Sequence, residues 1–388
     1  IGDNIVGETV KSKINRLRQI LIKKRINNIF VSAPENVAWL LNIRGNDNPN
    51  SPIPNCRLIM DKYKNIYLFS DLKKISKIQK KIKYRKIRFL DFNKFYDVLS
   101  KLNNKNIIID KLTCSIYYES LINSKFIIKG YEDPIYYLKS IKNKVEIENM
   151  KYAHIKDGVA LTKFLFWIKQ KKNFGFDEFF LEKKLEFFRK KSKDYISPSF
   201  DTIAGSGPNS AIIHYRSSNK SNRKIKQNDI FLCDSGGQYK YGTTDVTRTV
   251  CFAKPLERIK NIFTRVLKGH IAVTLNDLNK VKKGNLIDKK ARASLKRINL
   301  DYGHGTGHGV GFFLNVHEGP QAISKFNSVE LKEGMIVSNE PGYYEEGKFG
   351  IRIENLVYVE KIKNKLYFKN LTMAPIEKDL INEKLLSP

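Results

Sequence analysis

The chain has 388 residues, of which 41% are hydrophobic and 11% are aromatic, and its mean hydropathy is −0.42. These values are typical of a globular protein that is long enough for two domains, each with its own core. No apolar run approaches the roughly 20 residues that a membrane-spanning helix requires, which argues against membrane insertion.

The formal net charge is +32, from 71 Lys and Arg against 39 Asp and Glu. Such a charge often indicates an acidic partner such as nucleic acid. Lysines are spread through almost every segment, however, and are mixed with Ile and Asn. We therefore expect a solvated basic surface and no nucleic-acid partner. For the densest run, residues 73–88, we expect an exposed helix face, with a weak polyanion patch as the alternative.

The cysteines show no CxxC spacing and no regular framework, which favours a reduced, cytoplasmic compartment. They are Cys56, Cys114, Cys233 and Cys251. The chain begins with Ile1 and lacks the pattern of a signal peptide, so we expect it to be part of a longer protein.

In the first 138 residues, short apolar runs alternate with basic amphipathic segments. Residues 28–33, 65–71 and 106–110 are predicted strands, and the apolar spacing within residues 9–24 predicts a helix. The alternation indicates an α/β domain with helices on a mixed sheet. Residues 44–55, rich in Pro and Asn, are predicted to form a surface loop.

A second domain is predicted to begin near residue 139, which divides the chain into residues 1–138 and 139–388. It starts with a long amphipathic helix, on which we expect His154 to be structural. Its predicted apolar face consists of Ile147, Met150, Ile155, Val159 and Phe166. Two further helices, at residues 256–275 and 286–298, stand among segments of strand character, which indicates an α+β domain.

Two aspartates lie in a predicted pair of strands joined by a turn at Gly236 and Gly237. Asp234 ends the apolar run "IFLC", and Asp245 lies within "TTDVTRTVCF". Because Asp is depleted in strands, two of them in one sheet need a partner. Surface aspartates at strand ends are the alternative interpretation.

A second acidic pair makes a buried site the stronger interpretation. Glu340 ends an apolar strand before Pro341, and Glu354 lies inside the predicted strand "GIRIENLVYV". Four partly buried carboxylates repel one another unless protons or cations intervene. A pair of divalent cations would balance the four charges.

The stretch "GHGTGHGVGFFLNVHEG", residues 303–319, supplies imidazoles. One imidazole with four carboxylates forms an oxygen-rich ligand set. Such a set is more typical of a site for Mn²⁺ or a similar divalent ion than of a structural zinc site, which is built from Cys and His. Two metals bridged by carboxylates can activate water for hydrolysis. We expect the glycines to let the backbone approach the metals and a bound peptide, and to adopt dihedral angles closed to other residues.

The ordered acids and histidine resemble those of the pita-bread metallopeptidases, which include aminopeptidase P, prolidase and methionine aminopeptidase. The strings "GTTDVTRT", "HGTGHGVG", "LNVHEGP" and "FGIRIEN" are most similar to those of Xaa-Pro aminopeptidases of the long, cytosolic type. The resemblance implies an α+β pita-bread catalytic domain preceded by a creatinase-type α/β amino-terminal domain. A further domain of that type commonly comes before these two.

The resemblance also implies a role for each matching residue. Asp234 would bind one metal, His308 and Glu340 the other, and Asp245 with Glu354 would bridge both. His214, His304 and His317 would line the substrate site. Apart from the resemblance, an apolar pocket walled by His304, His317 and a nearby aromatic such as Phe312 or Tyr343 would suit a proline ring. Arg352 lies two residues before Glu354, on the same face of the strand, and would orient carboxylates. Glu340 would also carry a proton to the leaving nitrogen.

The implied activity is release of the N-terminal residue from peptides with proline in the second position, by attack of a water that bridges two divalent ions. Mn²⁺ is the expected ion, with Co²⁺ and Zn²⁺ as alternatives. A prolidase restricted to Xaa-Pro dipeptides, a metal-free creatine hydrolase and a non-catalytic pita-bread binding protein remain open. The family also implies a homodimer in which residues 44–54 approach the partner's active site.

Overall fold

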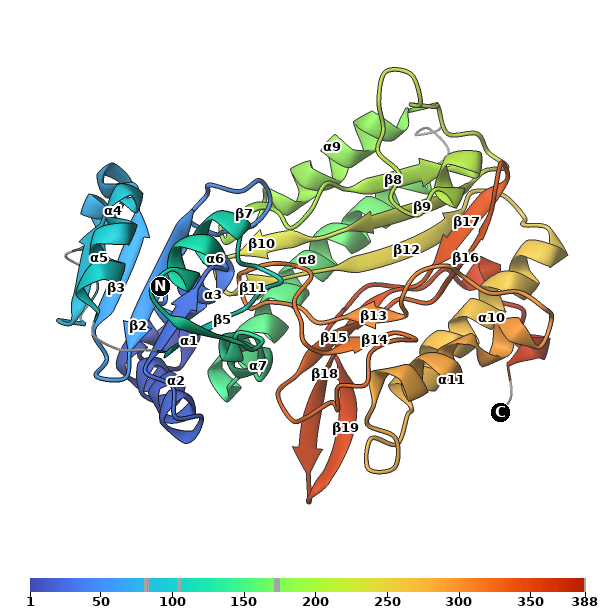
Figure 1. Ribbon diagram of the computed structural model, residues 1–388. Helices are drawn as coiled ribbons and strands as arrows, with labels where there is room; N and C mark the ends of the chain where they lie inside the picture. The colour runs from blue at the N-terminus through green and yellow to red at the C-terminus, as the bar shows by residue number, and fades with distance from the viewer. Residues whose placement is uncertain (80–81, 83, 103–105, 171–174, 387–388) are drawn as a thin grey trace. The chain divides into compact units, whose positions relative to one another are not determined.

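The structure is a computed structural model that describes residues 1–79, 82, 84–102, 106–170 and 175–386 (Figure 1). The chain divides into two compact units, Ile1–Lys139 and Ser140–Pro388. Both units combine helices and sheets, and the predicted α+β class is confirmed.

The described part of the first unit contains a six-stranded mixed sheet with the strand order β4-β3-β2-β1-β5-β6. Strand β1 pairs antiparallel with β2 and parallel with β5, as expected for a mixed sheet. The strands are β1 (Asn28–Val31), β2 (Cys56–Asp61), β3 (Ile66–Ser70), β4 (Ile87–Leu90), β5 (Asn106–Ile109) and β6 (Ile127–Gly130). The helices are α1 (Asp3–Val6), α2 (Val10–Lys23), α3 (Pro34–Leu40), α4 (Leu72–Gln79), η1 (Phe92–Lys94), α5 (Phe95–Lys101), α6 (Ile116–Asn123) and α7 (Pro134–Ser140).

Local sequence explains the first predicted helix, α2. The side chain of Thr9 accepts a hydrogen bond from the Ser12 amide at 3.2 Å and caps the helix. Ile14, Leu17 and Leu21 are fully buried, as their helical spacing predicts. The basic run begins as α4, and its residues 80, 81 and 83 lie outside the described residues.

The second unit is built from short sheets and long helices. The strands are β7 (Tyr195–Pro198), β8 (Ile203–Ser206), β9 (Ile230–Ser235), β10 (Gly237–Tyr239), β11 (Gly242–Thr243), β12 (Val246–Cys251), β13 (Gly307–His308), β14 (Ala322–Ile323), β15 (Ile336–Asn339), β16 (Gly342–Glu345), β17 (Phe349–Arg352), β18 (Asn355–Ile362) and β19 (Lys365–Asn370). The helices are α8 (Lys144–Ile168), α9 (Glu178–Arg189), η3 (Gly207–Ala211), α10 (Glu257–Thr274), α11 (Gly284–Lys296), η4 (Lys378–Leu380) and η5 (Glu383–Leu385).

Helices α8 and α9 run along the sheet of β8, β9 and β12, whereas α10 packs with α11 and contacts β15, β16 and β17 (Figure 1). A capping box between Asn143 and Glu146 starts α8.

The predicted apolar face of α8 is partly wrong. Ile155 and Val159 are each 50% exposed and Phe166 is 71% exposed, whereas His154 is buried. The Nδ1 atom of His154 lies 2.8 Å from the Met150 carbonyl oxygen. The buried face of α8 is shifted by about one residue from the predicted face, because the contacts with α9 and the sheet decide which side chains are buried. The spacing of apolar residues along a single helix does not reveal these contacts.

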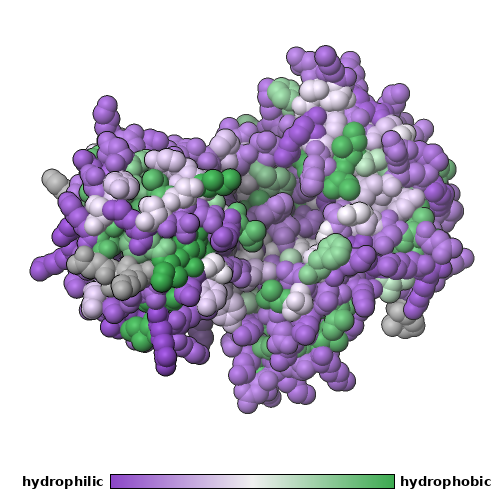
Figure 2. All heavy atoms as spheres, viewed as in Figure 1, coloured by the Kyte–Doolittle hydropathy of each residue, from purple (hydrophilic) through white to green (hydrophobic). Residues whose placement is uncertain are grey.

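Hydrophilic residues cover most of the face shown in Figure 2 and do not gather in one patch. No described helix is long and apolar enough to cross a membrane. All four cysteines are buried free thiols.

Candidate metal centre

Strand pairing brings the two aspartates together. Strands β9 and β12 are antiparallel, and Asp234 stands opposite Thr247, two residues beyond Asp245. Strands β10 and β11 form a second hairpin between them, so the predicted turn at Gly236 and Gly237 is wrong. Gly237 instead begins β10, which pairs with β7. Asp245 lies in the link between β11 and β12 and not within a strand.

The two glutamates lie at the ends of strands. Glu340 directly follows β15, and its amide donates to the Thr306 carbonyl at 2.8 Å. Glu354 lies between β17 and β18, so its predicted place inside one strand is wrong. Its amide donates to the Thr247 carbonyl at 3.2 Å, which holds it against β12.

The expected ligands form groups that share members. Asp234, Asp245 and Glu354 offer oxygens that all lie within 4.8 Å of one another, and His308, Glu340 and Glu354 form a second such group. A third group joins Asp245 and His308 with His317. Glu354 belongs to the first two groups, and Asp245 belongs to the first and the third. The geometry therefore suits two neighbouring cations with shared carboxylates.

The electrostatics of the carboxylates favour cation binding. Burial, together with the charges of Asp234 and Glu340, raises the pKa of Asp245 well above its ordinary value. Burial and the charge of Asp245 raise the pKa of Glu354 in the same way. The Oδ1 atoms of Asp234 and Asp245 are buried and have no hydrogen-bond partner among the residues that the structure describes. Buried acceptors of this kind fit divalent cations, which would provide the missing partners.

Glu340 differs from the other acids because cationic and imidazole groups surround it. Burial opposes its ionisation, but the side chains of His308, His304 and Arg352 outweigh this effect and lower the pKa of Glu340. The Nε2 atom of His308 lies 3.4 Å from Glu340 Oε1 and 3.4 Å from Asp245 Oδ2.

Two hydroxyl residues that the sequence did not reveal orient the acids. Ser338 Oγ donates to Glu340 Oε1 at 2.9 Å and accepts from the His308 amide at 2.8 Å. Thr247 Oγ1 donates to Glu354 Oε2 at 2.7 Å. In the sequence, only their positions point to these roles: Ser338 stands two residues before Glu340, and Thr247 stands two residues after Asp245.

Arg352 lies in the cavity with the acids, and its Nη2 donates to Asp234 Oδ2 at 2.7 Å. Its Nη1 donates to the hydroxyl of Tyr344 at 2.6 Å, and this hydroxyl lies 2.8 Å from His304 Nε2. His304 Nδ1 is 2.7 Å from the Gly305 carbonyl oxygen, so both ring nitrogens of His304 have protein partners. Burial lowers the pKa of His304.

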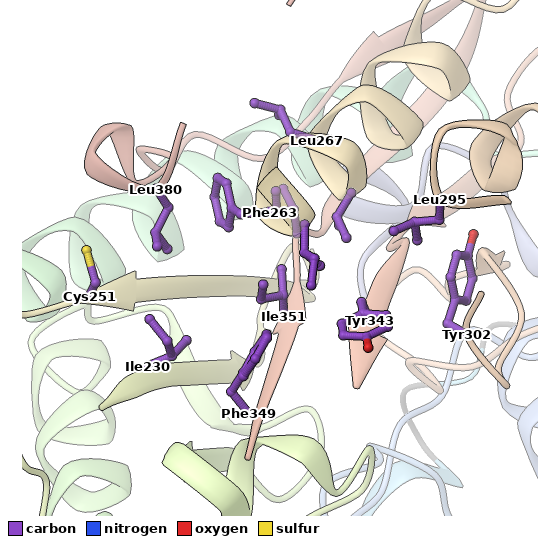
Figure 3. Close-up of a cluster of buried hydrophobic side chains, with 13 residues drawn as sticks. Ile230, Cys251, Phe263, Leu267, Leu295, Tyr302, Tyr343, Phe349, Ile351 and Leu380 are labelled. Carbon is purple, nitrogen blue, oxygen red and sulfur yellow. The ribbon is translucent and has the colours of Figure 1, made fainter. Parts of the chain in front are cut away.

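The expectation that Tyr343 walls the substrate pocket is wrong. Side chains alternate between the two faces of β16, so Tyr344 points to the site and Tyr343 to the other side. Figure 3 shows Tyr343 in a hydrophobic cluster with Ile351 and Phe263. Phe312 is buried away from the cavity as well.

The acids open into a cavity of about 260 Å³. His214, His304, His308 and His317 all line it. The ring centroids of His308 and His317 lie 4.0 Å apart. The His308 imidazole, together with burial, lowers the pKa of His317 to about 4. Apolar and basic side chains complete the walls, namely Phe200, Ile203, Ile213, Val316 and Arg216.

Some glycines of residues 303–319 serve the packing of the main chain, whereas a Cβ atom on Gly303 or Gly319 would meet no atom within 4 Å. None of these glycines has a positive φ, so the expected need for unusual dihedral angles is wrong. A Cβ atom on Gly307 would clash with the main-chain oxygen of Ser338, and one on Gly309 with that of Glu318. Gly307 therefore lets the strand that carries His308 lie directly against β15, and Gly309 lets the chain pass close to Glu318.

The two units and the cluster of acids with one histidine define a protein of the pita-bread metallopeptidase class. The pattern of metallopeptidase family M24 matches residues 148–361, and that of the creatinase/prolidase N-terminal domain matches residues 1–146. The chain therefore belongs to metallopeptidase family M24.

Xaa-Pro aminopeptidase 1 of Dictyostelium discoideum is 38% identical to this chain and covers all of it. The crystal structure of an X-prolyl aminopeptidase from Caenorhabditis elegans, a cytosolic enzyme with a di-nuclear active site, matches all of this chain and 66% of its own, with a TM-score of 0.90 and 31% identity. The Xaa-Pro dipeptidase from Bacillus anthracis matches 95% of this chain and 99% of its own, with a TM-score of 0.79 and 25% identity. The chain spans 62–67% of the length of four curated relatives it matches, including 64% of the Dictyostelium enzyme.

Proposed function

We propose that the chain is a dinuclear-metal aminopeptidase that releases the N-terminal residue from peptides with proline in the second position. The observation that carries this proposal is the membership of Glu354 in two groups of three potential ligands. Membership of family M24 supports the reaction class. The names of the Dictyostelium and C. elegans relatives support the choice of substrate.

We assign Asp234 to one metal ion, His308 and Glu340 to the other, and Asp245 with Glu354 to both. A set of carboxylates with one imidazole suits Mn²⁺, with Co²⁺ or Zn²⁺ as alternatives. When bound, two such ions lower the pKa of a shared water and polarise the scissile carbonyl group.

Glu340 is the proposed proton carrier. Its Oε1 accepts the Ser338 hydroxyl, which fixes the carboxylate at the cavity wall. The nitrogen of a penultimate proline carries no hydrogen before cleavage, so it must receive a proton as it leaves. A carboxylate fixed at the reacting bond can take a proton from the attacking water and deliver it to that nitrogen.

His317 and His214 are the imidazoles we assign to the carbonyl groups of the peptide. Both ring nitrogens of His304 already have protein partners, so we assign His304 to positioning Tyr344 and, through it, Arg352. Arg352 in turn orients Asp234. A ring N–H aimed at a developing oxyanion stabilises the transition state more than the ground state.

The proline ring needs an apolar wall. Phe200, Ile213 and Val316 line the same cavity as His317 and are the side chains we assign to it. A shape-based pocket suits a nitrogen that can donate no hydrogen bond.

A prolidase restricted to dipeptides is the second candidate, and the likeness to the B. anthracis dipeptidase favours it. The two are separated by kcat/KM on Xaa-Pro against Xaa-Pro-Xaa. Preference for the tripeptide supports the aminopeptidase, and hydrolysis of dipeptides alone supports the prolidase. A non-catalytic binding protein is disfavoured because all five expected ligand positions meet in two groups.

We further propose a cytoplasmic homodimer in which residues 44–54 approach the partner's active site, with domains at residues 1–138 and 139–388. Buried free thiols support a reduced compartment. The spread of lysines supports our prediction of no nucleic-acid partner. Sedimentation measures the oligomeric state, and titration with nucleic acid at physiological salt tests the second point.

Elemental analysis together with hydrolysis of an Xaa-Pro-Xaa peptide tests the proposed function. We expect two divalent ions per chain of the wild type. Asp245→Asn should lose metal, and its activity should fall by at least about 100-fold, because even a change in a residue that only orients a metal ligand lowers affinity or activity by roughly 10–100-fold. Asp277→Asn, a matched change at an exposed aspartate, should leave both unchanged. Equal activity of Asp245→Asn and the wild type would refute the dinuclear mechanism, and activity on creatine without metal would favour the metal-free alternative.

A further inference from the structure

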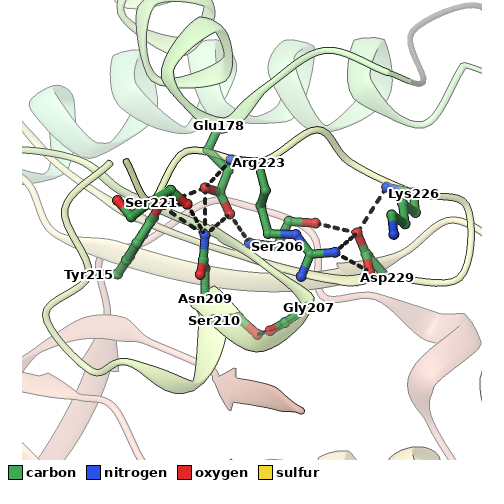
Figure 4. Close-up of polar contacts among 10 residues, drawn as sticks. All are labelled: Glu178, Ser206, Gly207, Asn209, Ser210, Tyr215, Ser221, Arg223, Lys226 and Asp229. Carbon is green, nitrogen blue, oxygen red and sulfur yellow. Dashed lines mark hydrogen bonds and ion pairs between the residues drawn. The ribbon is translucent and has the colours of Figure 1, made fainter. Parts of the chain in front are cut away.

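Glu178, the first residue of α9, is a fully buried carboxylate and is not among the residues that line the cavity of the acids. Figure 4 shows its polar contacts. Its Oε1 accepts the Ser206 amide at 2.7 Å, and its Oε2 accepts the Tyr215 hydroxyl at 2.7 Å. Asn209 Nδ2 donates to Oε2 at 2.9 Å, and the Arg223 amide donates to the same oxygen at 3.1 Å. These donors are neutral groups. Ser206 is the last residue of β8, and the other three donors come from the stretch of chain that follows this strand.

This stretch, residues 207–223, is called the His214 loop here. It leaves β8, forms η3 and returns towards β9. It contributes Ile213, His214 and Arg216 to the cavity that holds the acids. Tyr215 is 2% exposed, whereas its neighbour His214 is exposed. The buried tyrosine is therefore the anchor that fixes the main chain beside the imidazole.

Two further contacts fix the loop at places other than Tyr215. Asn209 Nδ2 also donates to the Ser221 carbonyl at 2.8 Å, which joins the outgoing and returning arms of the loop. The Gly350 amide donates to Ser210 Oγ at 2.7 Å, which ties the loop to β17, the strand that carries Arg352. Glu178 holds both arms, because it binds Asn209 and Tyr215 on one and the Arg223 amide on the other.

We propose that Glu178 is a positioning residue, which holds the His214 loop so that His214 faces the peptide in the metal cavity. The role of His214 rests on the proposed function. A carboxylate can accept all of these hydrogen bonds with its two oxygens. A glutamine of the same size would present an NH₂ group to buried donors, leave them unsatisfied and loosen the loop.

Hydrolysis of an Xaa-Pro-Xaa peptide by the metal-loaded full chain tests the link to His214. We expect Glu178→Gln to lower kcat/KM by at least tenfold, and Glu178→Gln with His214→Ala to be no slower than His214→Ala alone. Losses that multiply in the double variant would overturn the proposal, because the two residues would then act independently. Glu186→Gln is the matched control on the same helix, where the carboxylate pairs with the exposed Lys190, and it should keep the wild-type rate.

Hydrogen exchange of the same variants tests the proposal without reference to activity. We expect the amides of residues 207–223 to exchange at least tenfold faster in Glu178→Gln than in the wild type, with Glu186→Gln unchanged. Tyr215→Phe, which removes one donor and keeps the ring, should accelerate the same amides and serves if Glu178→Gln does not fold. Unchanged exchange in the loop would overturn the proposal. A wild type that cleaves no Xaa-Pro peptide would refute the proposed function, while exchange would still decide whether Glu178 holds the loop.

Discussion

Removal of the Lys142 charge should destabilise the second unit strongly. Lys142 Nζ lies 2.9 Å from Glu318 Oε1, and both side chains are 1% exposed. In Lys142→Met the stem of the side chain is kept while the buried Glu318 carboxylate loses the charge of Lys142. Breaking one side of a buried ion pair costs about 3–5 kcal/mol. For a domain of about 150–250 residues this corresponds to a fall in Tm of roughly 6–20 °C.

The position of the pair suggests an effect on the site as well. The Glu318 amide donates to the Gly309 carbonyl at 2.7 Å, and Glu318 directly follows His317. The Lys142 amide donates to the Gly334 carbonyl at 2.9 Å, just before β15. Loss of the pair should therefore loosen the segment that carries His308 and His317, and lower peptide hydrolysis at temperatures where the protein is still folded.

Urea unfolding, followed by the fluorescence of Trp167 in the second unit, measures the free energy of unfolding. Lys280→Met is the matched control, because Lys280 pairs with Asp277 at 3.9 Å on the surface and is 84% exposed. Loss of this surface pair should lower the free energy of unfolding by less than about 1 kcal/mol. Lys142→Met with Glu318→Leu should recover at least half of the loss, since replacing both members of a buried pair by apolar groups is often near neutral. A free energy of unfolding for Lys142→Met within about 1 kcal/mol of the wild type would refute the reasoning.

Two other predictions concern the orientation of a ligand and the pH dependence of the first unit. Thr247→Val removes the hydroxyl that donates to Glu354 and accepts from Arg352 Nε at 3.1 Å, so Mn²⁺ affinity measured by competition with a chelator should fall by roughly 10–100-fold. Unchanged affinity would show that Glu354 needs no such support. Burial raises the pKa of Asp133 from 3.8 to about 6. Between these two values the folded chain keeps a proton that the unfolded chain releases. The free energy of unfolding of the first unit should therefore fall by about 3 kcal/mol as the pH rises from about 4 to about 6. Asp133→Asn should remove most of this dependence in urea unfolding followed by Trp39 fluorescence, and a variant with the same dependence as the wild type would contradict the assignment.

Local patterns in the sequence predicted many of the elements. The apolar spacing of residues 9–24 corresponds to α2, and the apolar runs at residues 28–33 and 106–110 correspond to β1 and β5. The five expected ligands could be identified because each stands in a short motif with its own neighbours. Helix propensity, strand alternation and such motifs depend on residues close together in the chain, so they can be read without a structure.

Contacts between distant segments were decided by the tertiary structure. Glu354 lies among Asp234, Asp245, His308 and Glu340 because β9, β12, β15 and β17 meet at their ends. The strand register, and not composition, sends Tyr344 to the site and Tyr343 to the core. Lys142 meets Glu318 across 176 positions, and Glu178 reaches Tyr215 across 37. Such pairings depend on how sheets and helices pack, and one sequence carries no local signal for them. The sequence by itself therefore determined which residues this protein has for its chemistry, and the packing decided how they are held.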